Sequence, residues 1–131
     1  MVESKIFKPT EALGFIITVE NYGNVPGCPD IPDVVKNRNS IKKTFYMLGI
    51  NEVIECTDGT RQEYSNKQSI VEQRIIRAHE SQGARKLLLF VYAAGHGVML
   101  QSSRTTQFVF NEADERRRYL ILEQLLGIQA N

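Results

Sequence analysis

The sequence has 131 residues, a length that suits one domain with one hydrophobic core. Hydrophobic residues make up 42% and the net charge is +1, so nothing in the composition predicts binding to nucleic acid or to an anionic membrane. No apolar run reaches the roughly 18 residues of a membrane span, and no signal-peptide pattern is present. Two cysteines, Cys28 and Cys56, do not make a disulfide framework, so we expect an intracellular, cytoplasmic protein with reduced thiols.

The chain begins with a polar lead-in over residues 1–12, and residues 13–131 are expected to form the domain. Leu13–Val19 is a short apolar and β-branched run, which predicts a buried strand. Residues 21–32 hold three prolines and two glycines, a composition typical of a loop.

A helix and a second strand are expected to follow this loop. Asp30 or Asp33 can cap the helix, and Gly49 is suited to end it. Its apolar face has helical spacing and consists of Val34, Ile41, Phe45 and Leu48. Glu52–Cys56 then predicts a second short strand.

The second helix is predicted to begin at Arg61, because Thr60–Glu63 has the pattern of a capping box. Gly83 is expected to end this helix. Lys86–Ala94 is the most apolar segment of the chain and is apolar on both faces, which is typical of a central strand in a parallel sheet.

Two further elements complete the expected order. Gln107–Phe110 predicts a short strand, and Asp114–Leu126 predicts a third helix that Gly127 stops. Alternating strands and helices favour an α/β fold, with a mostly parallel sheet and helices on both of its faces.

A histidine between two glycines follows the Lys86–Ala94 strand. His96 would lie at the carboxyl edge of the sheet, where α/β proteins bind ligands. An imidazole there can act as a general base, and the Gly97 amide can face a developing oxyanion. Taken alone, Gly-His-Gly favours a turn in which the histidine merely packs or caps.

In context, Phe90–Gly97 resembles the histidine motif of the caspase, paracaspase and metacaspase clan, in which a hydrophobic strand runs into Ser-Gly-His-Gly. Ala94 stands where serine is usual. Gly14–Ile17 resembles the clan's first strand, and Gly27–Asp30 is similar to a metacaspase stretch, although its Asn-Asp pair is not reproduced. Other blocks that resemble the family in the same order are Lys43–Phe45, Leu48–Ile50, Thr57–Thr60, Glu63, Phe108–Glu112 and Tyr119–Leu126.

The resemblance implies a truncated caspase-like domain with a flavodoxin-like layered sheet, in which Leu13–Val19 lies between Glu52–Cys56 and Lys86–Ala94. It also implies that His96 is the general base and Gly97 the oxyanion-hole amide. The family's nucleophilic cysteine lies about 50 residues after the histidine. Here 35 residues follow His96, and they contain no cysteine.

Cys28 is the alternative candidate for a nucleophile, and the competing interpretation is a loop thiol without a role. Cys56 fits a small apolar residue that ends a strand. His79 would lie late in the second helix, where a cation suits the helix dipole. These four cysteine and histidine residues lack the spacing of a metal motif, and no cofactor-binding pattern is present.

Two functions remain open. The first is a catalytically inactive caspase-like protein that acts as an interaction or structural subunit of a larger assembly. The second is a cysteine endopeptidase whose nucleophile lies on another chain or segment. Without a nucleophile strand, Lys86–Ala94 becomes a sheet edge, so we expect a protein partner or a second copy at this edge or at the third helix. The basic run Arg116–Arg118 would be a solvated helix start or a contact for an acidic partner.

Overall fold

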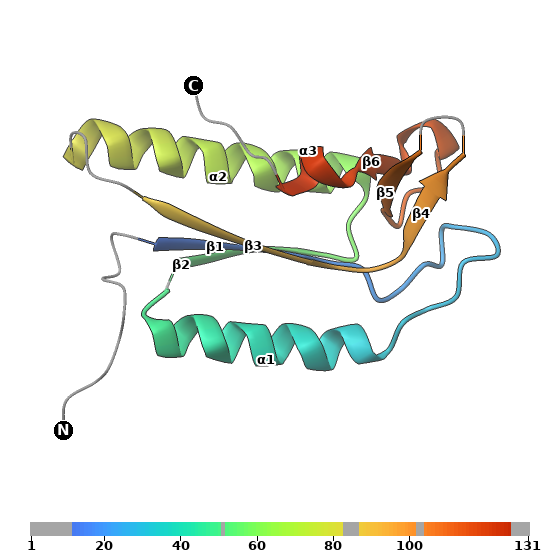
Figure 1. Cartoon of the computed structure of the whole chain (residues 1–131), viewed down its shortest axis with the longest axis horizontal. Coiled ribbons are helices and arrows are strands. Elements are labelled where there is room, and N and C mark those ends of the chain that lie inside the picture. Colours follow the sequence, from blue (N-terminus) through green and yellow to red (C-terminus); the bar gives the residue numbers. More distant parts are fainter. Residues whose placement is uncertain (1–11, 51, 83–86, 102–103, 127–131) are drawn as a thin grey trace.

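The fold is an α/β arrangement in which three parallel strands lie between two long helices (Figure 1). The structure, a computed structural model, describes residues 12–50, 52–82, 87–101 and 104–126. In chain order, its first elements are β1 (Ala12–Thr18), α1 (Asp33–Leu48), β2 (Glu52–Thr57), α2 (Arg61–Gln82) and β3 (Leu88–Ala94).

The strand order is β2-β1-β3, with both neighbours parallel to β1. This confirms the expectation that Leu13–Val19 lies between the other two strands. The apolar pattern of Lys86–Ala94 suggested a central strand, but β1 is central and β3 lies at an edge of the described sheet. Lys86 lies outside the described residues, and β3 begins at Leu88.

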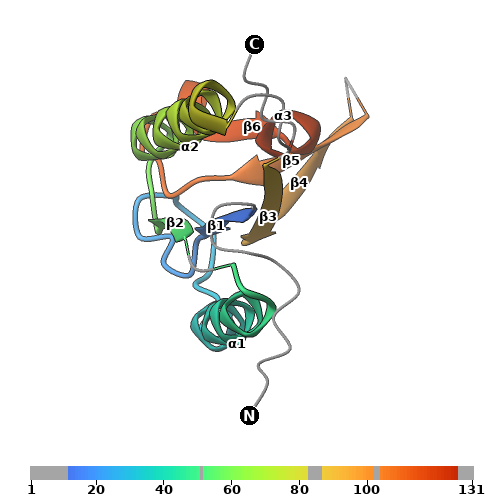
Figure 2. The ribbon, with the colours of Figure 1, turned by 90° about the vertical axis from the view of Figure 1, so that its left-hand side faces the viewer.

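Both faces of β1 are covered, since α1 and α2 lie on opposite sides of the sheet (Figure 2). All seven residues of β1 are buried. Phe15 and Ile17 belong to the core cluster that includes Tyr64 of α2. Ile16, which points to the other face because side chains alternate along a strand, joins the cluster around Phe45 of α1.

The first helix ends as expected but begins differently. Gly49 has φ 93°, a left-handed conformation that suits glycine, and its N–H donates to Tyr46 O at 3.1 Å. The predicted aspartate caps are wrong, because the residue before the helix is Pro32 and no side chain caps it. Asp30 instead accepts the Tyr22 N–H at 2.8 Å, and Asp33 is the first helical residue.

The second helix begins at Arg61, as the capping box predicted. Thr60 Oγ1 accepts the Glu63 N–H at 3.2 Å, which satisfies one of the helix's free N-terminal donors. The predicted end of this helix, Gly83, lies outside the described residues, and α2 is described to Gln82.

A small antiparallel sheet follows β3, in the order β4-β5-β6. Its strands are β4 (Gly97–Leu100), β5 (Thr105–Val109) and β6 (Tyr119–Ile121). The sequence did not predict β4, whereas Gln107–Phe110 overlaps β5. A short helix, α3 (Leu122–Leu126), comes after β6.

The predicted third helix over Asp114–Leu126 is therefore wrong. Asp114 caps a 3-10 turn, η1 (Glu115–Arg117), by accepting the Arg116 N–H. The next residues pair with β5, and this pairing buries Leu120 against Phe108. The 3-10 turn and then the long-range pairing of β6 thus replace the first part of the expected helix. Gly127 lies outside the described residues.

Among the helices in the described part of the chain, none combines the length and the apolar character needed to cross a bilayer.

Candidate functional site

His96 lies between the parallel sheet and the small antiparallel sheet, one residue before β4. The strands β1 and β3 end in register, with Thr18 opposite Ala94, and the Val19 N–H donates to Ala94 O at 2.9 Å. The loop that leaves β1 therefore passes beside the residues that leave β3. This common edge brings the loop's residues to the histidine.

The imidazole of His96 is held by a backbone carbonyl of that loop. Its Nε2 lies 2.7 Å from Pro29 O. A carbonyl oxygen only accepts hydrogen bonds, so Nε2 carries the proton and donates it. In the neutral imidazole Nδ1 is then the unprotonated nitrogen, and in that form it is the atom that can take a proton from a reacting group.

The backbone of His96 is held by a buried tyrosine from the same loop. The His96 N–H donates to the Tyr22 hydroxyl at 2.7 Å, and this hydroxyl donates to Val109 O at 3.0 Å. The Tyr22 and His96 rings lie 4.7 Å apart at an angle of 57°. Burial raises the pKa of Tyr22 to about 12, so its hydroxyl keeps its proton at neutral pH. Sequence reasoning missed Tyr22, because a tyrosine in a loop carries no periodic signal of burial.

The two glycines beside His96 have different surroundings. A Cβ on Gly95 would lie 2.6 Å from the Tyr22 hydroxyl and 3.1 Å from the Phe108 ring, so only glycine fits there. A Cβ on Gly97 would meet its nearest atom at 3.8 Å, which is ordinary contact. A methyl group would therefore fit at Gly97 without displacing a neighbour.

The Gly97 amide faces away from β5. Val109 N donates to His96 O, so His96 and Val109 form a hydrogen-bonded pair. Such pairs alternate along an antiparallel ladder, so the next pair, Gly97 and Phe108, exchanges no hydrogen bonds. The N–H of Gly97 therefore takes no part in the β4–β5 ladder, and an oxyanion-hole role would require an amide of this kind. That role stays a prediction.

Cys28 and His96 line one pocket of about 320 Å³. The other residues that line this pocket are Val25, Pro26, Gly27, Pro29, Gly97, Val98, Val109, Arg118 and Tyr119. Within the described residues, no hydrogen bond joins the Cys28 thiol to His96. Burial raises the pKa of the Cys28 thiol, although the positive charge of Arg118 opposes the shift, so the thiol stays protonated at neutral pH. The structure brings this residue beside the histidine without forming a dyad.

A second hollow, of about 170 Å³, borders His96 where β3 ends. The residues that line it are Ala93, Ala94, Gly95, His96, Gly97, Thr106, Gln107, Phe108 and Leu122.

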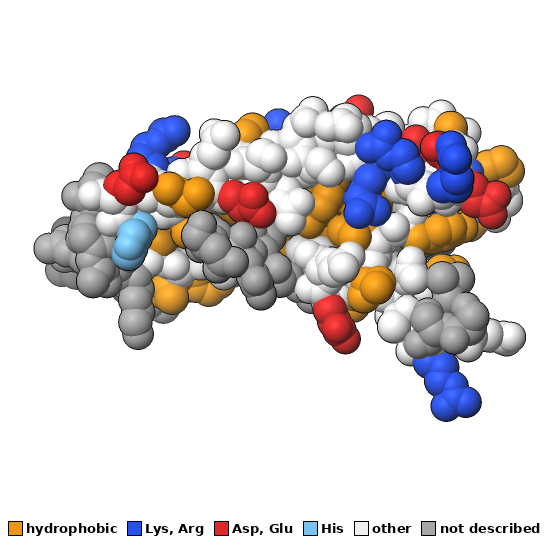
Figure 3. Space-filling model, turned by 90° about the horizontal axis from the view of Figure 1, so that it is seen from above, with side chains coloured by type: hydrophobic (Ala, Val, Ile, Leu, Met, Phe, Trp, Pro, Cys, Tyr) orange, Lys and Arg blue, Asp and Glu red, His pale blue; other side chains and the backbone are white. Residues whose placement is uncertain are grey.

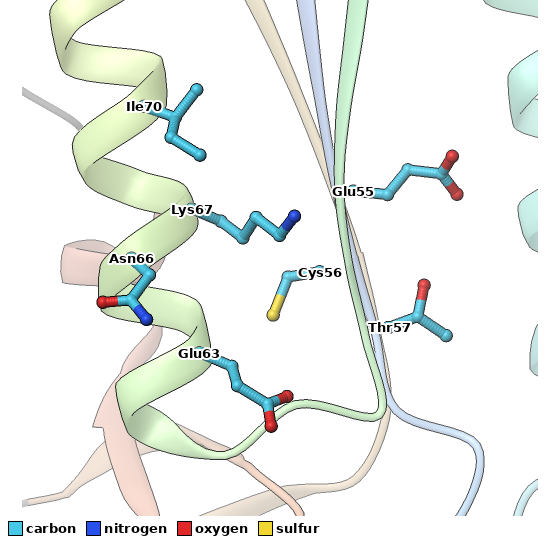
Figure 4. Close-up of a pocket in the computed structure, with 7 residues that line it drawn as sticks. All are labelled: Glu55, Cys56, Thr57, Glu63, Asn66, Lys67 and Ile70. Atoms are coloured by element: carbon cyan, nitrogen blue, oxygen red, sulfur yellow. The ribbon is translucent and has the colours of Figure 1, made fainter.

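Cys56 lies in a different place, between β2 and α2. Figure 4 shows its thiol directed toward α2, in a pocket of about 470 Å³ that Glu63 and Lys67 also line. Cys56 is opposite Ile17, which is opposite Ala93, so two strand spacings, about 10 Å, separate it from β3. Burial raises the pKa of its thiol to about 11, which fits a residue that packs in the core.

His79 lies in the last turn of α2, as predicted. Among the residues that the structure describes, no three side chains of the metal-binding types gather into a site.

The basic run Arg116–Arg118 is not a helix start. Figure 3 shows Lys and Arg side chains gathered over the end of the molecule that holds the small antiparallel sheet. Arg118 Nε donates to Glu112 O at 2.9 Å and its Nη2 donates to Ala113 O at 3.1 Å. Arg118 therefore holds the turn before β6, and its charge lies on the wall of the pocket that contains His96.

No protein-family model matches this chain, and a search of curated proteins found none that matches its sequence.

Proposed function

We propose that this chain is the histidine-bearing part of a caspase-like domain, catalytically inactive by itself, that serves as an interaction or structural subunit of a larger assembly. The observation that carries the proposal is the position of β3. Within the described residues it pairs with β1 alone, and His96 lies two residues after its last residue, Ala94. The resemblance of the sequence blocks to the caspase clan supports the same interpretation.

The outer side of β3 presents hydrogen-bonding groups for a further strand. Ala94 O accepts from Val19, so the residues that face β1 are Ala94 and every second residue before it. The N–H and C=O groups of Leu89, Val91 and Ala93 therefore point away from β1. A strand with unpaired groups along one side is a template for another chain.

The side chains of β3 indicate the chemistry of the added strand. Leu89 and Val91 pack against the core on the α2 face, and Tyr92 packs against the core on the α1 face. All three side chains are only partly buried. Fully burying a large apolar side chain is worth about 1.5–3 kcal/mol. An extended apolar segment, from a protein partner or a second copy, would bury both faces. It would also reach the hollow beside His96.

Two matched proline variants test this edge. Val91→Pro removes an N–H that points outward from β3. Glu55→Pro makes the same change on β2. Asp58 N donates to Thr18 O of β1, so Asp58 and every second residue before it face β1, and the N–H of Glu55 points outward. We expect light scattering to show concentration-dependent association that Val91→Pro abolishes and Glu55→Pro leaves intact. If the edge takes a different protein, the chain is monomeric and the outward amides of β3 exchange quickly. A monomer in which the Leu89, Val91 and Ala93 amides are protected from exchange contradicts the proposal.

The second candidate is a cysteine endopeptidase whose nucleophile lies on another chain or segment. The contact between His96 Nε2 and Pro29 O favours it, because in the neutral imidazole this contact leaves Nδ1 as the nitrogen that can activate a thiol. Two measurements separate the candidates: the intact mass of the native protein, and turnover of peptide substrates that are cut after basic or acidic residues. Native activity that His96→Ala abolishes supports the endopeptidase. Absence of turnover by a native chain that ends at Asn131 supports the inactive subunit.

A further inference from the structure

We propose that Tyr22 is a positioning residue for His96: its hydroxyl replaces a strand-to-strand hydrogen bond and thereby sets the direction of the histidine's main chain. The inference rests on the proposed role of His96 as the histidine of the site.

The replaced bond follows from the ladder between β4 and β5. Val109 N donates to His96 O at 3.0 Å, which is half of an antiparallel hydrogen-bonded pair. The other half would be donated by the His96 N–H to Val109 O. The Tyr22 hydroxyl stands between these two atoms instead, at 2.7 Å from His96 N and 3.0 Å from Val109 O. The hydroxyl therefore holds His96 N and Val109 O farther apart than the roughly 2.9 Å of a direct N–H···O bond.

The same loop holds the other side of the imidazole. Tyr22 N donates to Asp30 Oδ1 at 2.8 Å, so Tyr22 is tied to the end of the loop that carries Pro29. Pro29 O then binds Nε2 of His96. The imidazole therefore lies between the Tyr22 ring and the Pro29 carbonyl, which the loop holds in place relative to each other. Gly95 has no Cβ and so leaves the space that the Tyr22 hydroxyl occupies.

Loss of the hydroxyl removes the hydrogen-bond partner of both the His96 N–H and Val109 O. Tyr22 is 1% exposed, so water does not reach the position of its hydroxyl from the surface. Without the hydroxyl, the His96 N–H and Val109 O either remain buried without a partner or close into a direct bond. Closure draws the His96 backbone toward β5 and changes the distance from its imidazole to Pro29 O.

Tyr22→Phe is the test, and Tyr64→Phe is its matched control. Tyr64 is also a buried tyrosine, and its hydroxyl contacts Leu125 O at 3.5 Å, away from His96. Nitrogen-15 NMR of the whole chain reports the imidazole tautomer and the amide exchange of His96. We expect Tyr22→Phe to speed exchange of the His96 amide about tenfold if its N–H is left without an acceptor, or to reduce the share of the Nε2–H tautomer if the pair closes into a direct bond, whereas Tyr64→Phe changes neither. An unchanged tautomer and amide exchange in a folded Tyr22→Phe variant overturn the proposal.

If Tyr22→Phe does not fold, the wild-type chain decides. A Tyr22 hydroxyl proton that exchanges slowly and shows a nuclear Overhauser effect to the His96 amide proton supports the bridge, and its absence overturns it. Neither readout depends on peptide turnover or on association through β3. A failure of the proposed function therefore leaves this result standing, and a failure here leaves the β3 variants to decide the function.

Discussion

The steric requirement at Gly95 leads to a prediction of large effect. In Gly95→Ala the new Cβ would lie 2.6 Å from the Tyr22 hydroxyl and within 3.2 Å of two atoms of the Phe108 ring. Both neighbours are buried, and two hydrogen bonds hold the hydroxyl, so neither can move freely. Overpacking costs about 1–3 kcal/mol, and weakening a buried hydrogen bond adds about 1 kcal/mol. We expect Gly95→Ala to lower the free energy of unfolding by about 2–4 kcal/mol.

Gly97→Ala is the control, since it makes the same change two residues along the chain. Its Cβ meets no atom closer than 3.8 Å, so no neighbour has to shift. Replacing glycine by alanine where the backbone permits it stabilises a protein by about 0.4–1 kcal/mol, because the unfolded chain loses freedom. Gly97→Ala is therefore expected to be neutral or slightly stabilising.

Urea denaturation followed by circular dichroism measures both variants against the wild type. The midpoint should fall clearly for Gly95→Ala and hold or rise for Gly97→Ala, with similar slopes. Equal midpoints for the two variants would refute the reasoning, because they would mean that the Tyr22 hydroxyl does not occupy the space beside Gly95.

Two further predictions concern groups around the sheet's carboxyl edge. Burial raises the pKa of Cys56 from 9 to about 11, so its contribution to stability is full below pH 9 and is lost as the pH rises from 9 through 11. Between pH 8 and pH 10, the urea midpoint should therefore fall less steeply with pH for Cys56→Ala than for the wild type. The same fall of the midpoint in both proteins contradicts this. Asp58 accepts hydrogen bonds from Glu20 N and from Asn21 N and Nδ2, so Asp58→Ala should lower the free energy of unfolding by about 1–3 kcal/mol. Asp33→Ala, at an exposed first-turn position, is the control, and equal losses in thermal or urea denaturation would count against the Asp58 contacts.

The parallel sheet could be predicted because its signals are local. The three strands are short apolar runs separated by helical patterns, and they are Leu13–Val19, Glu52–Cys56 and Lys86–Ala94. Such alternation of strands and helices permits few topologies. The boundaries at Gly49 and Arg61 also rest on local chemistry, a left-handed turn and a capping hydroxyl. The strand order came from the resemblance, and the observed pairing confirms it.

The C-terminal part could not be predicted in this way. Tyr119–Leu126 is apolar enough for either a helix or a strand, and the choice depends on pairing with β5. The partners of His96 are hidden for a similar reason. Pro29 contributes a backbone carbonyl, which any residue possesses, and Tyr22 reaches the site only because the ends of β1 and β3 are in register. The sequence pattern therefore indicated the histidine but not what holds it.

The arrangement around His96 does not compete with a strand added to β3. The contacts that hold the histidine come from the loop after β1 and from β5, through Tyr22, Pro29 and Val109. The outward groups of β3 belong to its alternate residues and take no part in these contacts. An added strand would therefore approach His96 from the side of the smaller hollow, where Ala93 and Phe108 lie, and leave the pocket that contains Cys28 unchanged. Because the two sides are separate, association through β3 should alter exchange in that strand while the His96 tautomer stays as it is in the isolated chain.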